Sequence, residues 1–146
     1  MNVTDIDDKI IIRSRELGEE FAKFARKWEI AFFDDMKSLG VKMPDAITRV
    51  SEFMPEIIAY IEQIMKNGYG YASNGSVYFD IEAFKKNGKF TYAKLDPGSI
   101  SDPSKYLEGE GSLGVQLKSE KKNPFDFALW KKSKEGEPKW PSPWYF

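Results

Sequence analysis

Apolar side chains recur at spacings of three and four residues through the first half of the chain, a pattern that predicts amphipathic helices. One helix is predicted over Glu19–Leu39 and ends at Gly40. Its apolar stripe consists of Phe21, Phe24, Ala25, Trp28, Phe32, Met36 and Leu39. A second helix is predicted over Asp45–Lys66, in which Pro55 indicates a break, a kink or a new helix start because proline lacks an amide proton.

A shorter helix is predicted within Asn2–Arg15, where acidic residues precede three isoleucines. Thr4 or Asp5 is expected to cap its N-terminus, where acids also interact favourably with the helix dipole. Asp5, Asp7 and Asp8 offer oxygen ligands of the kind that Mg²⁺ or Ca²⁺ binds, but their spacing lacks the glycine and the late glutamate of a calcium loop. We interpret these acids as helix-start and surface charges and predict no metal site.

The second half of the chain contains strand patterns. Tyr69–Asp80 is expected to be a β-hairpin, because aromatic and branched residues flank Asn74-Gly75, the dipeptide that best accepts a two-residue type I′ turn. Phe125–Lys132 alternates enough to form a further strand. Between them, Ile81–Lys86 is expected to form one helical turn and Thr91–Leu117 a long loop rich in Gly, Ser, Pro and Asp.

Length and composition bound the class of protein. The chain has 146 residues, of which 41% are hydrophobic and 31% charged, so it is long enough for a core of its own and too apolar for disorder. We expect one α+β domain over residues 1–146, with helices packed on a small, mostly antiparallel sheet. No apolar run approaches the roughly 20 residues of a membrane helix, and the acidic N-terminus lacks a signal pattern. A cytoplasmic protein without a membrane partner is therefore expected.

Two residue types are missing from the sequence, which contains no cysteine and no histidine. Disulfides, thiolate nucleophiles, zinc–thiolate sites and imidazole bases are therefore excluded from this chain. Any chemistry would have to use carboxylates, lysines, hydroxyls or backbone groups. This restriction argues against an autonomous enzyme.

Positive charge gathers towards the C-terminus. From Gly114 onward the chain has seven basic and four acidic residues, although its net charge is −1. Aromatic residues interleave with six of these lysines, which are Lys118, Lys121, Lys122, Lys131, Lys132 and Lys134. The segment fits either an RNA-binding surface, with cations for phosphates and rings for bases, or a solvated lysine face over an aromatic core.

Four stretches of sequence, in this order, carry a family resemblance. They are Asn2-Val3-Thr4-Asp5-Ile6-Asp7-Asp8-Lys9-Ile10-Ile11, then Asn67-Gly68-Tyr69-Gly70-Tyr71 continuing into Asn74-Gly75-Ser76-Val77-Tyr78-Phe79-Asp80, then Glu108-Gly109-Glu110-Gly111, and finally Lys122-Asn123-Pro124-Phe125-Asp126-Phe127-Ala128-Leu129-Trp130-Lys131 with its proline-rich continuation to Trp144. The chain resembles cysteinyl-tRNA synthetases of the eukaryote-like form. Order and spacing agree over essentially the whole chain.

The resemblance implies a fold and a function. The chain would correspond to the connective insertion between the two halves of a class I nucleotide-binding fold, without the complete half-folds. Members of the family use ATP to attach cysteine to its tRNA and hold the cysteine sulfur on a zinc ion. The family's ATP motifs and zinc ligands are absent from this sequence. We therefore expect neither ATP nor zinc to bind this segment, and we expect it to be inactive alone and to position the tRNA acceptor end.

The resemblance also implies site residues and partners. Thr4 would line the cysteine pocket, and no catalytic residue is assigned. The lysines expected near the tRNA acceptor end are Lys121, Lys122, Lys131, Lys132 and Lys134. The run Lys131-Lys132-Ser133-Lys134 is similar to the family's ATP-handling loop, but its neighbours belong to a different family signature. The implied partners are the tRNA for cysteine and the missing catalytic halves of the synthetase.

Two alternative functions stay open on the sequence alone. The chain could be a stand-alone RNA-binding or regulatory module that acts in trans. It could also be one piece of a split enzyme, which would regain activity only with the missing halves. An RNA module would bind tRNA with an affinity that falls as salt rises.

Overall fold

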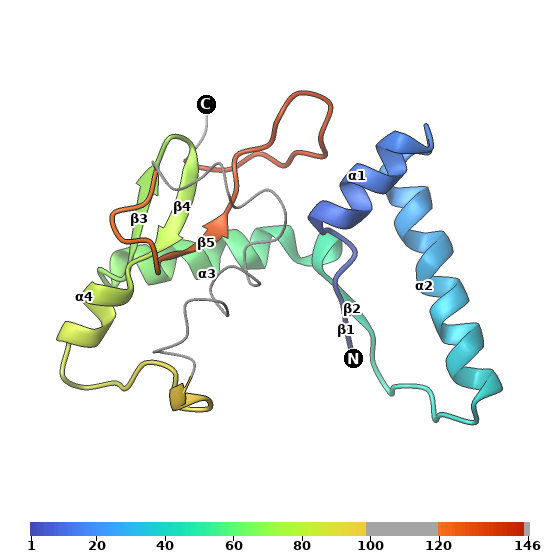
Figure 1. The fold of residues 1–146 in the computed structure, drawn as a ribbon, viewed down its shortest axis with the longest axis horizontal. Helices are drawn as coiled ribbons and strands as arrows, with labels where there is room; N and C mark the ends of the chain where they lie inside the picture. Colours follow the sequence, from blue (N-terminus) through green and yellow to red (C-terminus); the bar gives the residue numbers. More distant parts are fainter. Residues whose placement is uncertain (99–119, 145–146) are drawn as a thin grey trace. The chain divides into compact units, whose positions relative to one another are not determined.

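The computed structural model describes residues 1–98 and 120–144, which fall into two compact units. Unit 1 consists of Met1–Ile57 with Glu135–Trp140, and unit 2 consists of Ile58–Lys134 with Pro141–Phe146 (Figure 1). The motif at residues 108–111 and most of the predicted loop up to Leu117 lie outside the described residues. That residues 1–146 form a single domain stays a prediction.

Unit 1 begins with two helices that pack against each other, α1 (Asp8–Glu16) and α2 (Phe21–Ser38) (Figure 1). Gly18 turns the chain between them with a φ of 65°, a conformation that glycine adopts without steric cost. The side chain of Glu20 caps α2 by accepting from the amide of Ala22. Because Gly40 follows with a φ of 72°, the helix predicted over Glu19–Leu39 is confirmed with its stop signal.

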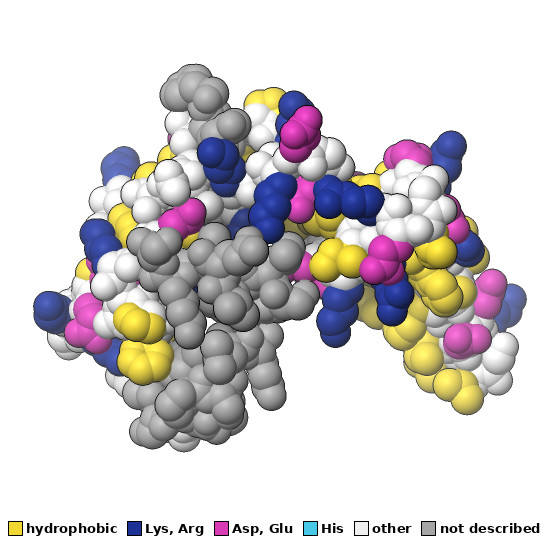
Figure 2. All heavy atoms as spheres, turned by 45° about the horizontal axis from the view of Figure 1, so that its top comes forward, with side chains coloured by type: hydrophobic (Ala, Val, Ile, Leu, Met, Phe, Trp, Pro, Cys, Tyr) yellow, Lys and Arg dark blue, Asp and Glu magenta, His cyan; other side chains and the backbone are white. Residues whose placement is uncertain are grey.

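The apolar stripe of α2 is only partly buried. Phe24 and Ala25 are buried, whereas Trp28 is 57% and Phe32 41% exposed. Figure 2 shows hydrophobic side chains along this helix on the surface of the unit. The spacing therefore predicted the helix correctly, but the structure buries one part of the stripe and leaves another part open.

A short parallel pair of strands also belongs to unit 1. In this pair β1 (Asn2–Val3) lies beside β2 (Thr48–Arg49), with Asn2 opposite Thr48 and Val3 opposite Arg49. The short helix predicted to start after a cap at Thr4 or Asp5 begins later, at Asp8, and the prediction of helix from Asp45 to Arg49 was wrong. The pairing partners are 46 residues apart, so local propensity carried no signal for it.

The chain then enters a single 3₁₀ turn, η1 (Val50–Phe53), and continues as α3 (Met54–Lys66). Pro55 is the second residue of α3, where its missing amide proton costs no hydrogen bond. Of the break, kink or new helix start predicted at Pro55, the structure has the new helix start. A left-handed Gly68 with a φ of 81° ends the segment.

Unit 2 contains the antiparallel sheet, with the strand order β3 (Gly70–Ser73), β4 (Ser76–Phe79) and β5 (Phe127–Trp130). Asn74 and Gly75 both have positive φ, 55° and 84°, as a type I′ turn requires. The predicted hairpin and the predicted strand near the C-terminus are confirmed, the latter over four residues. Figure 1 shows the three strands side by side in front of α3.

The core of unit 2 lies between this sheet and its helices. Val77, Tyr78 and Ile81 are almost fully buried, and Ile61 of α3 is 3% exposed. The predicted helical turn is present as α4 (Ile81–Lys86), whose N-cap Asp80 accepts from the amide of Ala83. The described residues are thus α+β with a small antiparallel sheet, as predicted. None of the helices in the described ranges has the length and hydropathy needed to cross a membrane.

Candidate functional site

Thr4 lies exposed in the extended segment that joins β1 to α1. The prediction that Thr4 or Asp5 caps α1 is wrong. The N-cap is Asp7, whose backbone is extended. Its carboxylate accepts a hydrogen bond from the amide nitrogen of Lys9 at 3.1 Å. The capping requirement is met further along the chain, so the Thr4 hydroxyl is not needed for it.

Asp5, which follows β1, is hydrogen-bonded to Ser51, which lies just after the parallel strand β2. One carboxylate oxygen lies 3.0 Å from the amide nitrogen of Ser51, and the other accepts from the Ser51 hydroxyl. Ser51 is in the first turn of η1, where amide protons have no partner within the helix. Asp5 therefore caps η1 from 46 residues away and fixes the backbone that follows Thr4.

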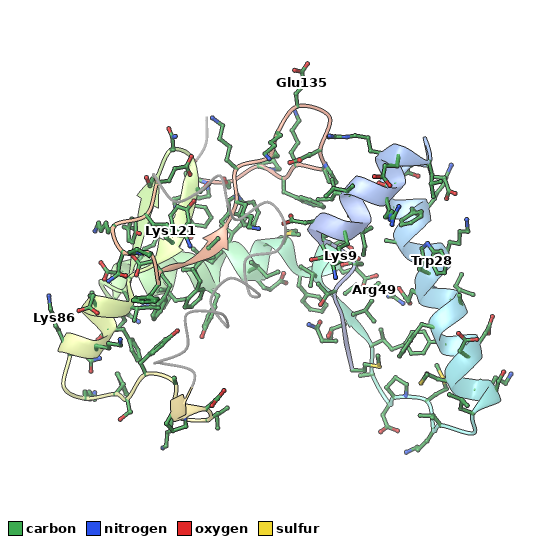
Figure 3. All side chains as sticks on the ribbon, in the orientation of Figure 1. Lys9, Trp28, Arg49, Lys86, Lys121 and Glu135 are labelled. Carbon is green, nitrogen blue, oxygen red and sulfur yellow. The ribbon has the colours of Figure 1, made fainter. Side chains whose placement is uncertain are left out.

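A buried carboxylate anchors the strand that lies beside Val3. Glu29 of α2 is 8% exposed and accepts two hydrogen bonds from the Arg49 guanidinium, at 2.8 and 2.9 Å. Arg26 also donates to Glu29, and Arg49 donates to Glu52 at 2.9 Å. Figure 3 shows Arg49 on the side of β2 that faces α2.

The charges of this network shift the pKa values of both main partners. The Arg49 hydrogen bond holds the pKa of Glu29 below its ordinary value, against the opposing effect of burial. The hydrogen bond from Glu29 raises the pKa of Arg49 in turn. Both groups are therefore charged at neutral pH, and the pair fixes β2 against α2.

The three N-terminal aspartates have separate roles. Asp5 binds Ser51, Asp7 caps α1, and Asp8 is the acid in the first turn of α1. Among the described residues, no group of three acidic, cysteine or histidine side chains is arranged to hold a metal ion. Next to this segment, the Thr48 hydroxyl donates to the side-chain oxygen of Asn2 at 3.2 Å.

The predicted lysines lie in two stretches of unit 2. Lys121 is half-buried, and burial together with the nearby charge of Lys131 lowers its pKa. Lys122 is exposed, with its ammonium 3.7 Å from Asp80 and 4.2 Å from the centre of the Tyr71 ring. The other lysines are exposed and follow β5: Lys131, Lys132 and Lys134.

The sequence prediction missed a buried carboxylate beside Lys122. Asp126 is 1% exposed and accepts from the Tyr71 hydroxyl at 2.7 Å, the Ile81 amide at 3.0 Å and the Asn123 amide at 3.2 Å. Burial and this negative charge raise the pKa of Tyr71 well above its ordinary value. The signal in the sequence was one acid between two phenylalanines of an otherwise apolar run.

Residues 1–145 match the family described as tRNA synthetases class I (C) catalytic domain. The chain belongs to this family. It is 57% identical over 145 residues to a Dictyostelium discoideum protein named cytoplasmic cysteine–tRNA ligase. It is 51% identical over 126 residues to the human protein of that name, and 47% identical over 144 residues to a cysteine–tRNA ligase of Pyrococcus horikoshii.

The matches cover most of this chain but a small share of each relative. They include 99%, 85% and 99% of this chain for the Dictyostelium, human and Pyrococcus proteins, in that order. The corresponding shares of the relatives are 22%, 17% and 28%. The chain therefore spans about a fifth of the length of these class I synthetases.

Proposed function

We propose that this chain is a segment of a cysteine–tRNA ligase, the enzyme that uses ATP to join cysteine to its tRNA. The identity of 57% over 145 residues to a protein of that name carries the proposal. Because the chain spans 22% of that relative, the activity belongs to a longer protein. The eukaryotic relatives are named cytoplasmic, which supports the same location for this protein.

The segment corresponds to the connective insertion of the synthetase and not to its nucleotide-binding halves. In support, the larger sheet among the described residues is antiparallel, whereas nucleotide-binding halves are built on parallel sheets. In residues 1–98 and 120–144, no strand is followed by a glycine-rich phosphate loop. ATP would therefore be bound by other parts of the enzyme.

This segment has no suitable ligands for a zinc ion that binds the cysteine sulfur. Zinc sites of that kind use thiolate and imidazole ligands, and the chain has neither cysteine nor histidine. The ligands would have to come from another part of the ligase. The segment alone would be inactive for the same reason.

Thr4 is the residue we assign to the cysteine pocket. Its side chain is exposed, and the backbone on both sides of it is fixed. Val3 pairs with Arg49 before it, and Asp5 binds Ser51 after it. A hydroxyl presented from a fixed backbone is suited to contact a small polar substrate.

The lysines of unit 2 are assigned to tRNA phosphates near the acceptor end. Lys131, Lys132 and Lys134 are exposed in the stretch after β5, where their charges can approach a polyanion. Lys122 is exposed, although Asp80 and the Tyr71 ring hold its ammonium. Lys121 is the most buried of the five. It would add to the positive electrostatic potential around the four exposed lysines.

A chimeric enzyme tests the proposal. The matching stretch of the Dictyostelium ligase is replaced by residues 1–145 of this chain, and ATP–pyrophosphate exchange is measured with each amino acid. We expect exchange that depends on cysteine. A chimera that folds, as judged by circular dichroism and gel filtration, but activates no cysteine would contradict the proposal.

A further inference from the structure

A buried carboxylate of α2 is connected to the segment that presents Thr4. The Glu29 side chain is 5% exposed, and its two oxygens accept separate hydrogen bonds from Nε and Nη2 of Arg49, at 2.8 and 2.9 Å. Two parallel hydrogen bonds between a guanidinium and a carboxylate fix the orientation of the two groups as well as their separation. Glu29 therefore sets where the Arg49 side chain lies relative to α2.

The backbone of Arg49 carries that position to the strand before Thr4. Arg49 belongs to β2 and lies opposite Val3 of β1 in the parallel register. The amide of Thr48 donates to the carbonyl oxygen of Met1 at 3.0 Å, so a backbone hydrogen bond joins the two segments. Thr4 is the residue that follows Val3. A displacement of β2 would therefore move Thr4 with β1.

The parallel pair is too short to fix its own position. β1 and β2 contain two residues each, and parallel strands normally lie in larger sheets that are covered on both faces. Glu29, by contrast, belongs to a helix of 18 residues, which is a stiff support, and it lies 20 residues before Arg49 in the sequence. The ion pair with Glu29 is therefore an anchor for β2 that the short ladder does not supply by itself.

We propose that Glu29 is a positioning residue for the Thr4 hydroxyl in the cysteine pocket, and that it acts through Arg49 and the pair of β1 and β2. Glu29 itself does not contact the substrate. The link to cysteine rests on the proposed function, because it depends on the assignment of Thr4 to the pocket. The structural part, that Glu29 holds β1 beside β2, does not rest on it and is measurable on this chain alone.

Hydrogen exchange at the Thr48 amide tests the structural part. Glu29→Gln keeps the size of the side chain but leaves one acceptor oxygen for the two Arg49 donors, so we expect this amide to exchange at least about tenfold faster. Ile61→Val, at a buried residue of unit 2, is the control for a general loss of stability. It should leave the Thr48 rate unchanged, because a two-residue pair exchanges by local opening. An unchanged rate in Glu29→Gln would overturn the proposal.

A double-mutant cycle in the chimeric ligase tests the link to the substrate. Glu29→Gln alone should raise the KM for cysteine about threefold, with kcat and the KM for ATP unchanged, because a displaced hydroxyl loses part of one hydrogen bond. In a Thr4→Val background the same substitution should have no further effect, since the hydroxyl that Glu29 positions is gone. An equal rise in KM in both backgrounds would show that Glu29 does not act through Thr4.

The two experiments separate this inference from the proposed function. If the chimera activates no cysteine while Glu29→Gln speeds exchange at Thr48, the proposed function fails and the structural link between α2 and β1 stands. If the chimera activates cysteine while Glu29→Gln changes neither the exchange rate nor the KM for cysteine, the proposed function stands and this inference fails. Faster exchange with an unchanged KM in an active chimera would also overturn the positioning role.

Discussion

The Asp5 carboxylate accepts two hydrogen bonds from Ser51, one from the amide at 3.0 Å and one from the hydroxyl. This contact joins the residue after Thr4 to the first turn of η1. It lies next to the ladder that pairs Val3 with Arg49. The segment that presents Thr4 is therefore held by backbone pairing on one side and by side-chain capping on the other.

A double-mutant cycle should detect the contact between these two residues. Asp5→Ala removes both hydrogen bonds and should lower the free energy of unfolding by about 1–2 kcal/mol, the usual effect of losing a helix cap. Ser51→Ala should cost less because the amide bond remains. We expect a coupling energy of about 1 kcal/mol from urea unfolding of the two single variants and the double variant. Additive effects would show that the side chains act independently.

Thr4 gives a prediction about substrate binding. In the chimeric ligase, Thr4→Val should raise the KM for cysteine about tenfold, because one hydrogen bond from a protein hydroxyl contributes roughly that factor. The KM for ATP should stay unchanged, and Thr4→Ser should restore most of the cysteine affinity. Thr91→Val, at an exposed threonine of unit 2, serves as the control. Equal KM values for cysteine in Thr4→Val and the parent would remove Thr4 from the pocket.

The Glu29 network predicts a contrast between two glutamates that contact the same arginine. Glu29 is buried, whereas the Glu52 side chain is 51% exposed. Glu29→Gln should lower the free energy of unfolding by about 2 kcal/mol, less than for a fully buried pair because water reaches part of the network. Glu52→Gln should cost no more than about 0.5 kcal/mol. Similar losses in the two variants would contradict the difference in burial.

The same carboxylate predicts a dependence of stability on pH. The Arg49 hydrogen bond lowers the pKa of Glu29, so its ionised form contributes stability that is present above the unfolded pKa and is lost as pH falls through the folded pKa. The stability difference between the parent and Glu29→Gln should therefore be largest above about pH 5 and shrink below about pH 4. Urea unfolding of both proteins across this range measures it. A difference that does not vary with pH would exclude Glu29 as its source.

The elements with local signals were predictable. Asn74-Gly75 demanded two positive φ values, and the structure has them. The spacing along α2 set its limits, and Pro55 marked the start of α3. In each case the deciding interaction lies within a few residues of the signal.

The features that depend on distant partners were not predictable. The residues of β2 were expected to be helical. The local pattern gave no sign of a strand there, because the partner strand β1 is 46 residues away. Thr4 or Asp5 was expected to cap α1, but the structure places the cap at Asp7, which the sequence prediction did not consider. Glu29 is the one polar residue that α2 buries, and it is charged whereas the stripe beside it is apolar. Its partner Arg49 became visible only in the structure.

The central claim is that a ligase needs this chain as an insertion and that the chain cannot perform the reaction alone. Charging of tRNA with cysteine tests this claim most directly. Radiolabelled cysteine is supplied to the isolated chain, to the Dictyostelium ligase lacking the matching stretch, and to the chimera that contains both. We predict charged tRNA only with the chimera. Charging by the isolated 146-residue chain, or none by a folded chimera, would contradict the account.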